Sequence, residues 1–243
     1  MNETVLYAAA DGAATITLNR PESRNALNAA MCDELFAAVK RALTDQGIIL
    51  AFIRANGTTF CAGADLKERQ GMSAGQVRAR RLKAFDAYAA IESLPMPTIA
   101  VVHGPAIGSG CEIAAACDFI VATPEAWFRT PEALRGTVGA TQRLPRILGK
   151  RLAKDMMFTG RTLSAEDALR AGLVARLVPA SGLEEELGRI SRGIQAAPAG
   201  ALRLAKRCID RGVELDPEGA LRAEIEAIDE QLASGHRLGA GRA

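Results

Sequence analysis

Two glycine-rich turns, each placed before a predicted helix, contain the residues best suited to chemistry in this sequence. In the first, "HGPAIGSGCEIAAACD" (103–118), Glu112 lies one turn into an otherwise apolar helix. A buried, unpaired carboxylate is costly, so Glu112 requires a hydrogen-bonded, water-filled or functional environment. The second turn, "FCAGADLKE" (60–68), has the same order of strand end, small residues and helix start. If the two turns converge, their free N–H groups supply two donors to one developing oxyanion.

The first turn has two competing interpretations. Gly108-Ser109-Gly110 resembles part of a dinucleotide-binding loop, but Ile113 occupies the third small position, where glycine normally allows close packing of helix and strand. In a purely structural interpretation the glycines only let the chain turn, and the placement of Glu112 argues against this. In the second turn, Asp65 is interpreted as a helix N-cap rather than a catalyst.

The elements around these turns have the order of a layered α/β protein. "TVLYAAADGAATITL" predicts a hairpin with Asp11-Gly12 at its turn, a strong hairpin signal. "GIILAFIRAN" is a continuous apolar run, typical of a strand covered on both faces. Strands and helices alternate to about residue 180, and only helices follow. We therefore predict an α/β core over 1–180 and a helical region over 181–243, with its helices at roughly 183–194, 198–211 and 217–233.

Composition narrows the class of protein. The 243 residues include 30 basic and 28 acidic side chains, so nothing demands a nucleic acid or membrane partner. The five cysteines form no C-x-x-C pair, which indicates reduced thiols and a cytoplasmic location. Neither a leader nor a membrane-spanning run is expected. The two histidines are too few for a histidine-rich metal site. The basic run "RARRLK" (78–83) is interpreted as a solvated helix face.

Five segments, found in this order, resemble the enoyl-CoA hydratase/isomerase (crotonase) family: "FCAGADLKE", "PMPTIAVVHGPAIGSGCEIAAACD", "FRTPEAL", "TQRLPR" and "AEDALRAGLV". The resemblance covers about residues 5 to 235. It implies a superhelix of repeated ββα units, with C-terminal helices that assemble a homotrimer or a dimer of trimers. It also implies an acyl-CoA thioester substrate, with CoA present only as part of that substrate and no other cofactor or metal.

The resemblance also implies roles for individual residues. The amides of Ala64 and Ser109 would hold the thioester oxygen, Glu112 would activate water, and Glu132 of the "PE" motif would protonate the α carbon. Taken alone, Glu132 would be interpreted as a surface acid after a proline. Contacts to CoA would come from the "NRPESRNALN" segment and the second turn, mostly through backbone atoms of Arg24, Ala26, Ala62, Asp65 and Leu66.

This sequence departs from the family pattern at two places in the site. Ser109 stands where glycine is usual, and "LRGTVGATQRL" is shorter than the usual "PGxGGTQRL" loop and lacks its proline. In hydratases an amide of that loop helps to hold the catalytic water, and Gly139 is the candidate replacement here. The expected activity is hydration of a 2-enoyl-CoA. The alternatives are a Δ3-Δ2 enoyl-CoA isomerase or a non-hydrating relative that binds acyl-CoA or RNA.

Overall fold

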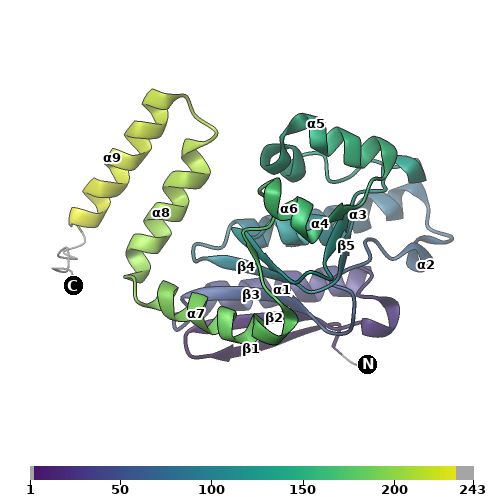
Figure 1. The fold of residues 1–243 in the computed structure, drawn as a ribbon, viewed down its shortest axis with the longest axis horizontal. Helices are drawn as coiled ribbons and strands as arrows, with labels where there is room; N and C mark the ends of the chain where they lie inside the picture. Colours follow the sequence, from purple (N-terminus) through teal and green to yellow (C-terminus); the bar gives the residue numbers. More distant parts are fainter. Residues whose placement is uncertain (1–2, 234–243) are drawn as a thin grey trace.

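The computed structural model describes residues 3–233, which form two sheets surrounded by helices (Figure 1). The larger sheet has six strands in the order β1-β2-β3-β4-β6-β9. β1 and β2 form the predicted antiparallel hairpin, and each later strand pairs in parallel with its neighbour. The strands are β1 (Val5–Ala10), β2 (Ala13–Leu18), β3 (Leu50–Ala55), β4 (Thr98–Val102), β6 (Phe119–Ala122) and β9 (Arg176–Leu177).

The chain also forms a second sheet, which has three short strands. It consists of β5 (Pro105–Ile107), β7 (Trp127–Arg129) and β8 (Leu163–Ser164), in that order. β4 leads into β5 and then a helix, and β6 leads into β7 and then a helix. The expected repetition of two strands and a helix is therefore present.

Helices cover both sheets and then continue alone at the C-terminus, as predicted (Figure 1). The apolar residues Leu27, Met31, Leu35, Val39 and Leu43 recur at every fourth position and predict a helix from Leu27. The helix begins at Ala29, because the Asn28 side chain caps it by accepting a hydrogen bond from the Met31 amide. Its expected first member, Leu27, pairs with Ala64 instead. The helices are α1 (Ala29–Thr44), α2 (Leu66–Arg69), α3 (Ala74–Glu92), α4 (Ser109–Ala115), α5 (Arg143–Thr159), α6 (Ala165–Arg170), α7 (Leu183–Gln195), α8 (Ala199–Gly212) and α9 (Pro217–Ala233).

The apolar run in β3 is explained by burial on both faces of the large sheet. Ala51 and Ile53 join the main core, in which α1, α3 and α4 also bury side chains. Leu50 and Phe52 point the other way, into a smaller cluster closed by Leu187 and other residues of α7. Alternate residues of a strand point to opposite faces, so all four positions from Leu50 to Ile53 are buried and apolar, and the charged Arg54 follows where burial is only partial.

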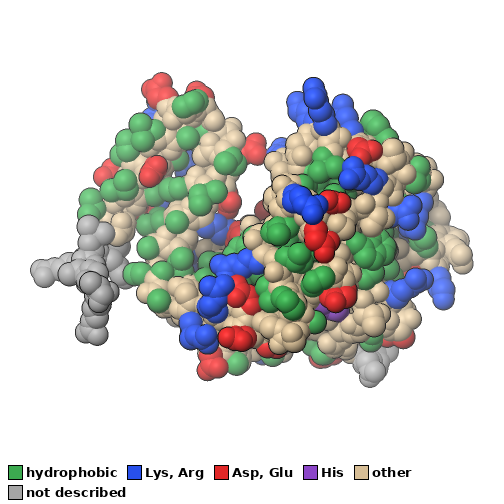
Figure 2. Space-filling view, in the orientation of Figure 1, with side chains coloured by type: hydrophobic (Ala, Val, Ile, Leu, Met, Phe, Trp, Pro, Cys, Tyr) green, Lys and Arg blue, Asp and Glu red, His purple; other side chains and the backbone are tan. Residues whose placement is uncertain are grey.

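The α8–α9 pair lies apart from the sheets and packs together as a helical hairpin (Figure 1). Hydrophobic side chains are spread over its visible surface (Figure 2). Within residues 3–233, no helix combines the length and the apolar character needed to cross a membrane.

Candidate active site

A cleft of about 710 Å³, counting the part open to solvent, lies where the two glycine-rich turns meet α3. The cleft is bounded by segment 62–66, by residues of α3, by the start of α4 and by segment 131–140. Of the nine residues predicted for the site, six line it: Ala62, Ala64, Leu66, Ser109, Glu112 and Glu132.

The other three predicted residues, Arg24, Ala26 and Asp65, are not part of the cleft lining but hold the second turn in place. The Arg24 carbonyl accepts a hydrogen bond of 3.0 Å from the Ala62 amide. The Ala26 carbonyl and the Asp65 carboxylate both accept from Nη1 of Arg20, at 2.5 Å and 3.1 Å. Asp65 also accepts from the first amides of α2, so its interpretation as an N-cap is confirmed. Contact of these three residues with CoA stays a prediction.

The Ala64 amide is turned toward the cleft by Leu27. The Leu27 amide donates to the Gly63 carbonyl at 2.8 Å, and the Leu27 carbonyl accepts from the Asp65 amide at 2.9 Å. In this parallel pairing, the residue between the two bonded neighbours directs its own N–H to the opposite side. Ala64 therefore presents its N–H away from Leu27, on the side where it lines the cleft.

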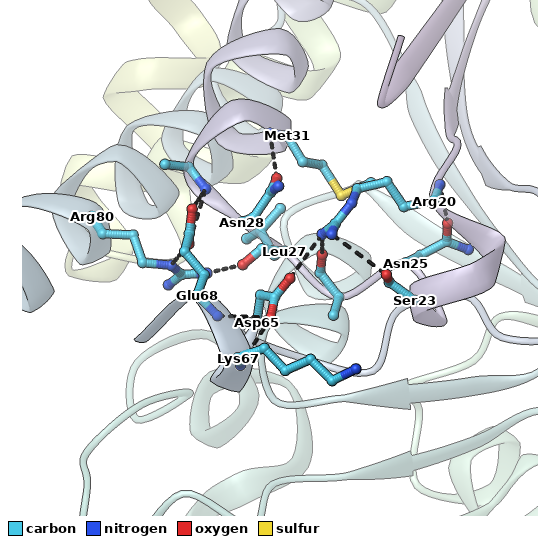
Figure 3. Close-up of polar contacts among 12 residues, drawn as sticks. Arg20, Ser23, Asn25, Leu27, Asn28, Met31, Asp65, Lys67, Glu68 and Arg80 are labelled. Atoms are coloured by element: carbon cyan, nitrogen blue, oxygen red, sulfur yellow. Dashed lines mark hydrogen bonds and ion pairs between the residues drawn. The ribbon is translucent and has the colours of Figure 1, made fainter. Parts of the chain in front are cut away.

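A partly buried ion pair fixes Leu27 in turn (Figure 3). Nε of Arg80 lies 3.0 Å from Oε2 of Glu68, and its Nη2 donates to the Leu27 carbonyl. The Glu68 carboxylate also accepts from the Ala29 amide at 2.9 Å. The interpretation of segment 78–83 as a solvated face is wrong for two of its arginines. Arg80 is buried, and Arg81 lines the cleft and donates to Thr137 Oγ1 at 2.9 Å.

The second amide comes from the start of α4. Gly108 precedes the helix with φ 53° and ψ −106°, a conformation suited to glycine. Ser109 is the first helical residue, and the amides of a first turn have no partner within the helix. The unusual backbone conformation thus falls on Gly108, which explains why serine is tolerated at 109. The Ser109 hydroxyl hydrogen-bonds the hydroxyl of buried Tyr88.

The two turns are held side by side by backbone pairing between Cys61 and Ala106. The Cys61 amide donates to Pro105 at 3.1 Å, and the Cys61 carbonyl accepts from Ile107 at 2.9 Å. A Cβ added to Gly63 would lie 3.0 Å from the Ile107 carbonyl oxygen and 3.9 Å from the Ser109 nitrogen. The structure therefore brings the two predicted turns together, with Ala64 and Ser109 on the same wall.

Glu112 is buried within α4, and its carboxylate is paired. Oε2 accepts from Nη1 of Arg143 at 2.9 Å, and the backbone amide of Ala140 also donates to the carboxylate. Burial raises the pKa of Glu112 above its ordinary value, and the hydrogen bond and charge of Arg143 oppose that rise. The short loop that departs from the family pattern thus supplies its Ala140 amide to Glu112.

Glu132 faces the start of α4 from the other side and is not paired. A Cβ on Gly108 would collide with its Oε1, and a Cβ on Gly139 would lie 3.0 Å from its Cγ. Its Oε2 is buried and has no hydrogen-bond partner among the described residues. Burial raises the pKa of Glu132, and the charge of nearby Glu112 raises it too, while a hydrogen bond from its own backbone amide and the charges of Arg135 and Arg81 oppose the rise. The two carboxyl groups differ in environment, because only Glu112 has an ion-pair partner.

Replacing Glu132 with glutamine is expected to stabilise the fold near neutral pH. A carboxyl whose pKa is raised by folding stabilises the protein below its unfolded pKa, and that contribution is lost as pH rises through the folded pKa. Ionised Glu132 therefore costs stability at pH 7, and a neutral amide removes this cost. We expect Glu132→Gln to raise the free energy of unfolding by about 1 kcal/mol at pH 7.

Urea denaturation at pH 7 and at pH 4 tests this expectation, since the gain should shrink at pH 4, where the wild-type carboxyl is largely protonated. Glu125→Gln is a suitable control, because a hydrogen bond to Thr123 lowers the pKa of exposed Glu125 and its loss should not stabilise the fold. A gain for Glu132→Gln that is equal at both pH values would contradict the electrostatic explanation.

Comparisons with known proteins agree with one another. A family model described as "Enoyl-CoA hydratase/isomerase" matches residues 8–239. The chain is 38% identical over 207 residues to a "Probable enoyl-CoA hydratase echA8" of Mycobacterium tuberculosis, covering 84% of this chain and 80% of the relative. It is 35% identical over 208 residues to a "Crotonyl-CoA hydratase" of Syntrophomonas wolfei, with the same two coverages. An enoyl-CoA hydratase structure from Bacillus anthracis superposes with a TM-score of 0.93 at 34% identity, covering 97% of this chain and 93% of that one.

Proposed function

Because this chain belongs to the enoyl-CoA hydratase/isomerase family, we propose that it adds water across the double bond of a 2-enoyl-CoA thioester. Its fold is the α/β crotonase fold with C-terminal helices, and its family implies an acyl-CoA substrate. The observation that carries the proposal is the pair of carboxyl groups. One is ion-paired and the other unpaired, and both line one cleft beside the amides of Ala64 and Ser109.

In the proposed reaction the thioester oxygen lies between the amides of Ala64 and Ser109. Glu112, whose charge Arg143 favours, takes a proton from water, and the resulting hydroxide adds to the β carbon. The electron pair moves to the thioester oxygen, where the two amides stabilise the enolate. Glu132 then gives its proton to the α carbon.

The unequal environments of the two carboxyl groups support these roles. A base must be ionised and an acid protonated at the same pH, which requires neighbours that push the two pKa values apart. Arg143 favours the ionised form of Glu112, and the Glu112 charge favours the protonated form of Glu132. The carboxyl groups interact, so the pair shares its two protonation steps.

The CoA moiety is expected to lie along Ala62 and Leu66 at the rim of the cleft, close to Arg24 and Ala26. Leu66 is exposed at this rim, and the Arg24 carbonyl is bonded to the Ala62 amide. The proposed contacts are mostly through the backbone, so they are better tested on the ligand than on the protein. A KM for crotonyl-pantetheine equal to that for crotonyl-CoA would contradict them.

We also propose that α8 and α9 assemble the chain into a trimer or a dimer of trimers. Exposed apolar side chains lie along this helical hairpin, and burying them would stabilise an assembly. A monomeric mass in light scattering would contradict the proposal. The exposed side chains are Ile209, Val213, Leu215, Leu221, Ile225, Ile228 and Leu232.

The test of the function is the absorbance of the conjugated thioester when the purified protein is mixed with crotonyl-CoA. Hydration removes the conjugation, so the absorbance should fall with multiple turnovers. A 3-enoyl-CoA is run in parallel, because an isomerase would raise the same absorbance from that substrate. Tight binding of crotonyl-CoA without turnover, together with isomerisation of the 3-enoyl thioester, would replace hydration with isomerisation as the activity.

A further inference from the structure

Arg143, the first residue of α5, links Glu112 to a second acid at the end of α3. Its Nη1 donates to Oε2 of Glu112 at 2.9 Å, and its Nη2 donates to Oε2 of Glu92 at 2.7 Å. Only 17% of the Arg143 side chain is exposed. The guanidinium carbon also lies 5.9 Å from the ring centroid of Tyr88, one helical turn before Glu92.

The three contacts give the guanidinium a fixed orientation. Glu92 and Tyr88 both belong to α3, so this helix holds the far side of the Arg143 group. The planar fork of arginine can bind two carboxylates in defined directions, which the point charge of lysine cannot do as well. Glu112 is thereby tied, through Arg143, to an acid that is itself half exposed, with 56% of its side chain accessible.

We propose that Arg143 is a positioning residue for Glu112, and that its guanidinium, anchored by Glu92, holds this carboxylate ionised and oriented toward the water that it activates. Arg143 is not in the lining of the cleft, so it acts through Glu112 and not on the substrate. The inference rests on the proposed hydration, because it assigns to Glu112 the role of base.

The charged and titratable groups that face Glu112 are few. Arg143 on α5, Glu92 and Tyr88 on α3, and Glu132 on the opposite wall surround it. Of these, Arg143 is the cation that favours the ionised carboxylate. Burial raises the pKa of Glu112 and the charge of Glu92 adds to the rise, while Arg143 limits it. Loss of the guanidinium should therefore raise this pKa further.

A base is active when deprotonated, so kcat/KM falls as pH drops through its pKa. In Arg143→Met the acidic limb of the kcat/KM profile should move to higher pH by about one unit or more, and kcat at neutral pH should fall about 10²-fold. KM should change little, because Arg143 does not line the cleft. Arg143→Lys keeps the charge and should recover part of both losses.

Two further variants sharpen the comparison. Glu92→Gln leaves Arg143 and Glu112 in place but weakens the anchor, so it should lower kcat less than Arg143→Met does. Arg146→Met is the matched control, because Arg146 lies one turn further along α5 and pairs with exposed Glu214. It removes a surface guanidinium from the same helix and should leave both kcat and the acidic limb unchanged.

An acidic limb that stays in place in Arg143→Met, while kcat falls no more than in Arg146→Met, would overturn the proposal. A loss of kcat with no shift of the limb and no recovery in Arg143→Lys would mean that Arg143 only supports the fold, and would overturn it as well. Carboxyl carbon NMR of labelled glutamate measures the Glu112 titration without any substrate. If the wild-type protein does not hydrate crotonyl-CoA, the proposed function fails. A Glu112 titration that moves only in the Arg143 variants would still support the inference that Arg143 keeps the Glu112 carboxylate ionised.

Discussion

Replacing Glu132 with glutamine is expected to lower kcat for crotonyl-CoA hydration by about 10²- to 10⁴-fold, with a much smaller change in KM. Glutamine keeps the size and the hydrogen-bonding capacity of the side chain but has no proton to give to the α carbon. Binding should persist, because the proposed thioester contacts come from the amides of Ala64 and Ser109. Stopped-flow absorbance with crotonyl-CoA measures kcat and KM together.

Glu112→Gln should cause a loss of similar size, for the different reason that water loses its base. The double variant should be little worse than either single one, since residues that act as a unit are not additive. If Glu132→Gln turned over at the wild-type rate, the acid would have to be another group. A large rise in KM with unchanged kcat would instead place Glu132 in binding.

The second large effect is expected from Gly108→Ala. The backbone of Gly108, with φ 53° and ψ −106°, is one that residues with a side chain rarely adopt. An added Cβ would also collide with Oε1 of Glu132. Either Glu132 moves or the Ser109 amide tilts away from the thioester oxygen, and loss of one such donor typically costs 10²- to 10³-fold in turnover. We expect kcat to fall by about that factor.

Gly172→Ala is the matched control for backbone strain. Gly172 also has a positive φ, 80°, but a Cβ there would meet nothing within 4 Å. It should lose some stability and keep its kcat. A full kcat in Gly108→Ala would show that the start of α4 is not part of the catalytic wall. Circular dichroism at the assay temperature confirms that each variant is folded before kinetics are compared.

Much of this fold could be predicted from local patterns, because they reflect burial directly. The hairpin turn at Asp11-Gly12, the two-sided burial of β3 and the final three helices all have short-range signals, and each is present in the structure. α1 begins at Ala29, two residues later than the apolar pattern predicts. The reason is that Leu27 pairs with Ala64, which is distant in the sequence. Pairing of that kind has no signature within a local window.

The residues of the site differ in how far the sequence alone predicts them. The positions of Glu112 and Ser109 could be read from one turn, whereas Glu132 was recognisable only by its place in a family motif. Arg143 was missed, although it stands in the quoted "TQRLPR" segment, because nothing in the sequence shows that α5 begins beside α4. Arg80 was misread for a similar reason, since a basic run shows how many charges a helix has but not which of them turns inward.

The succession of parallel strands also governs how quickly the chain can reach this structure. Each parallel pairing, such as β2 with β3 or β3 with β4, requires an intervening segment to cross over before any strand contact forms. Structures dominated by such distant pairings fold slowly, because loop closure comes before the contacts that repay it. The cleft joins segments from residue 62 to residue 140. In a refolding experiment, helical circular dichroism should therefore return first, and catalytic turnover should be among the last properties to recover.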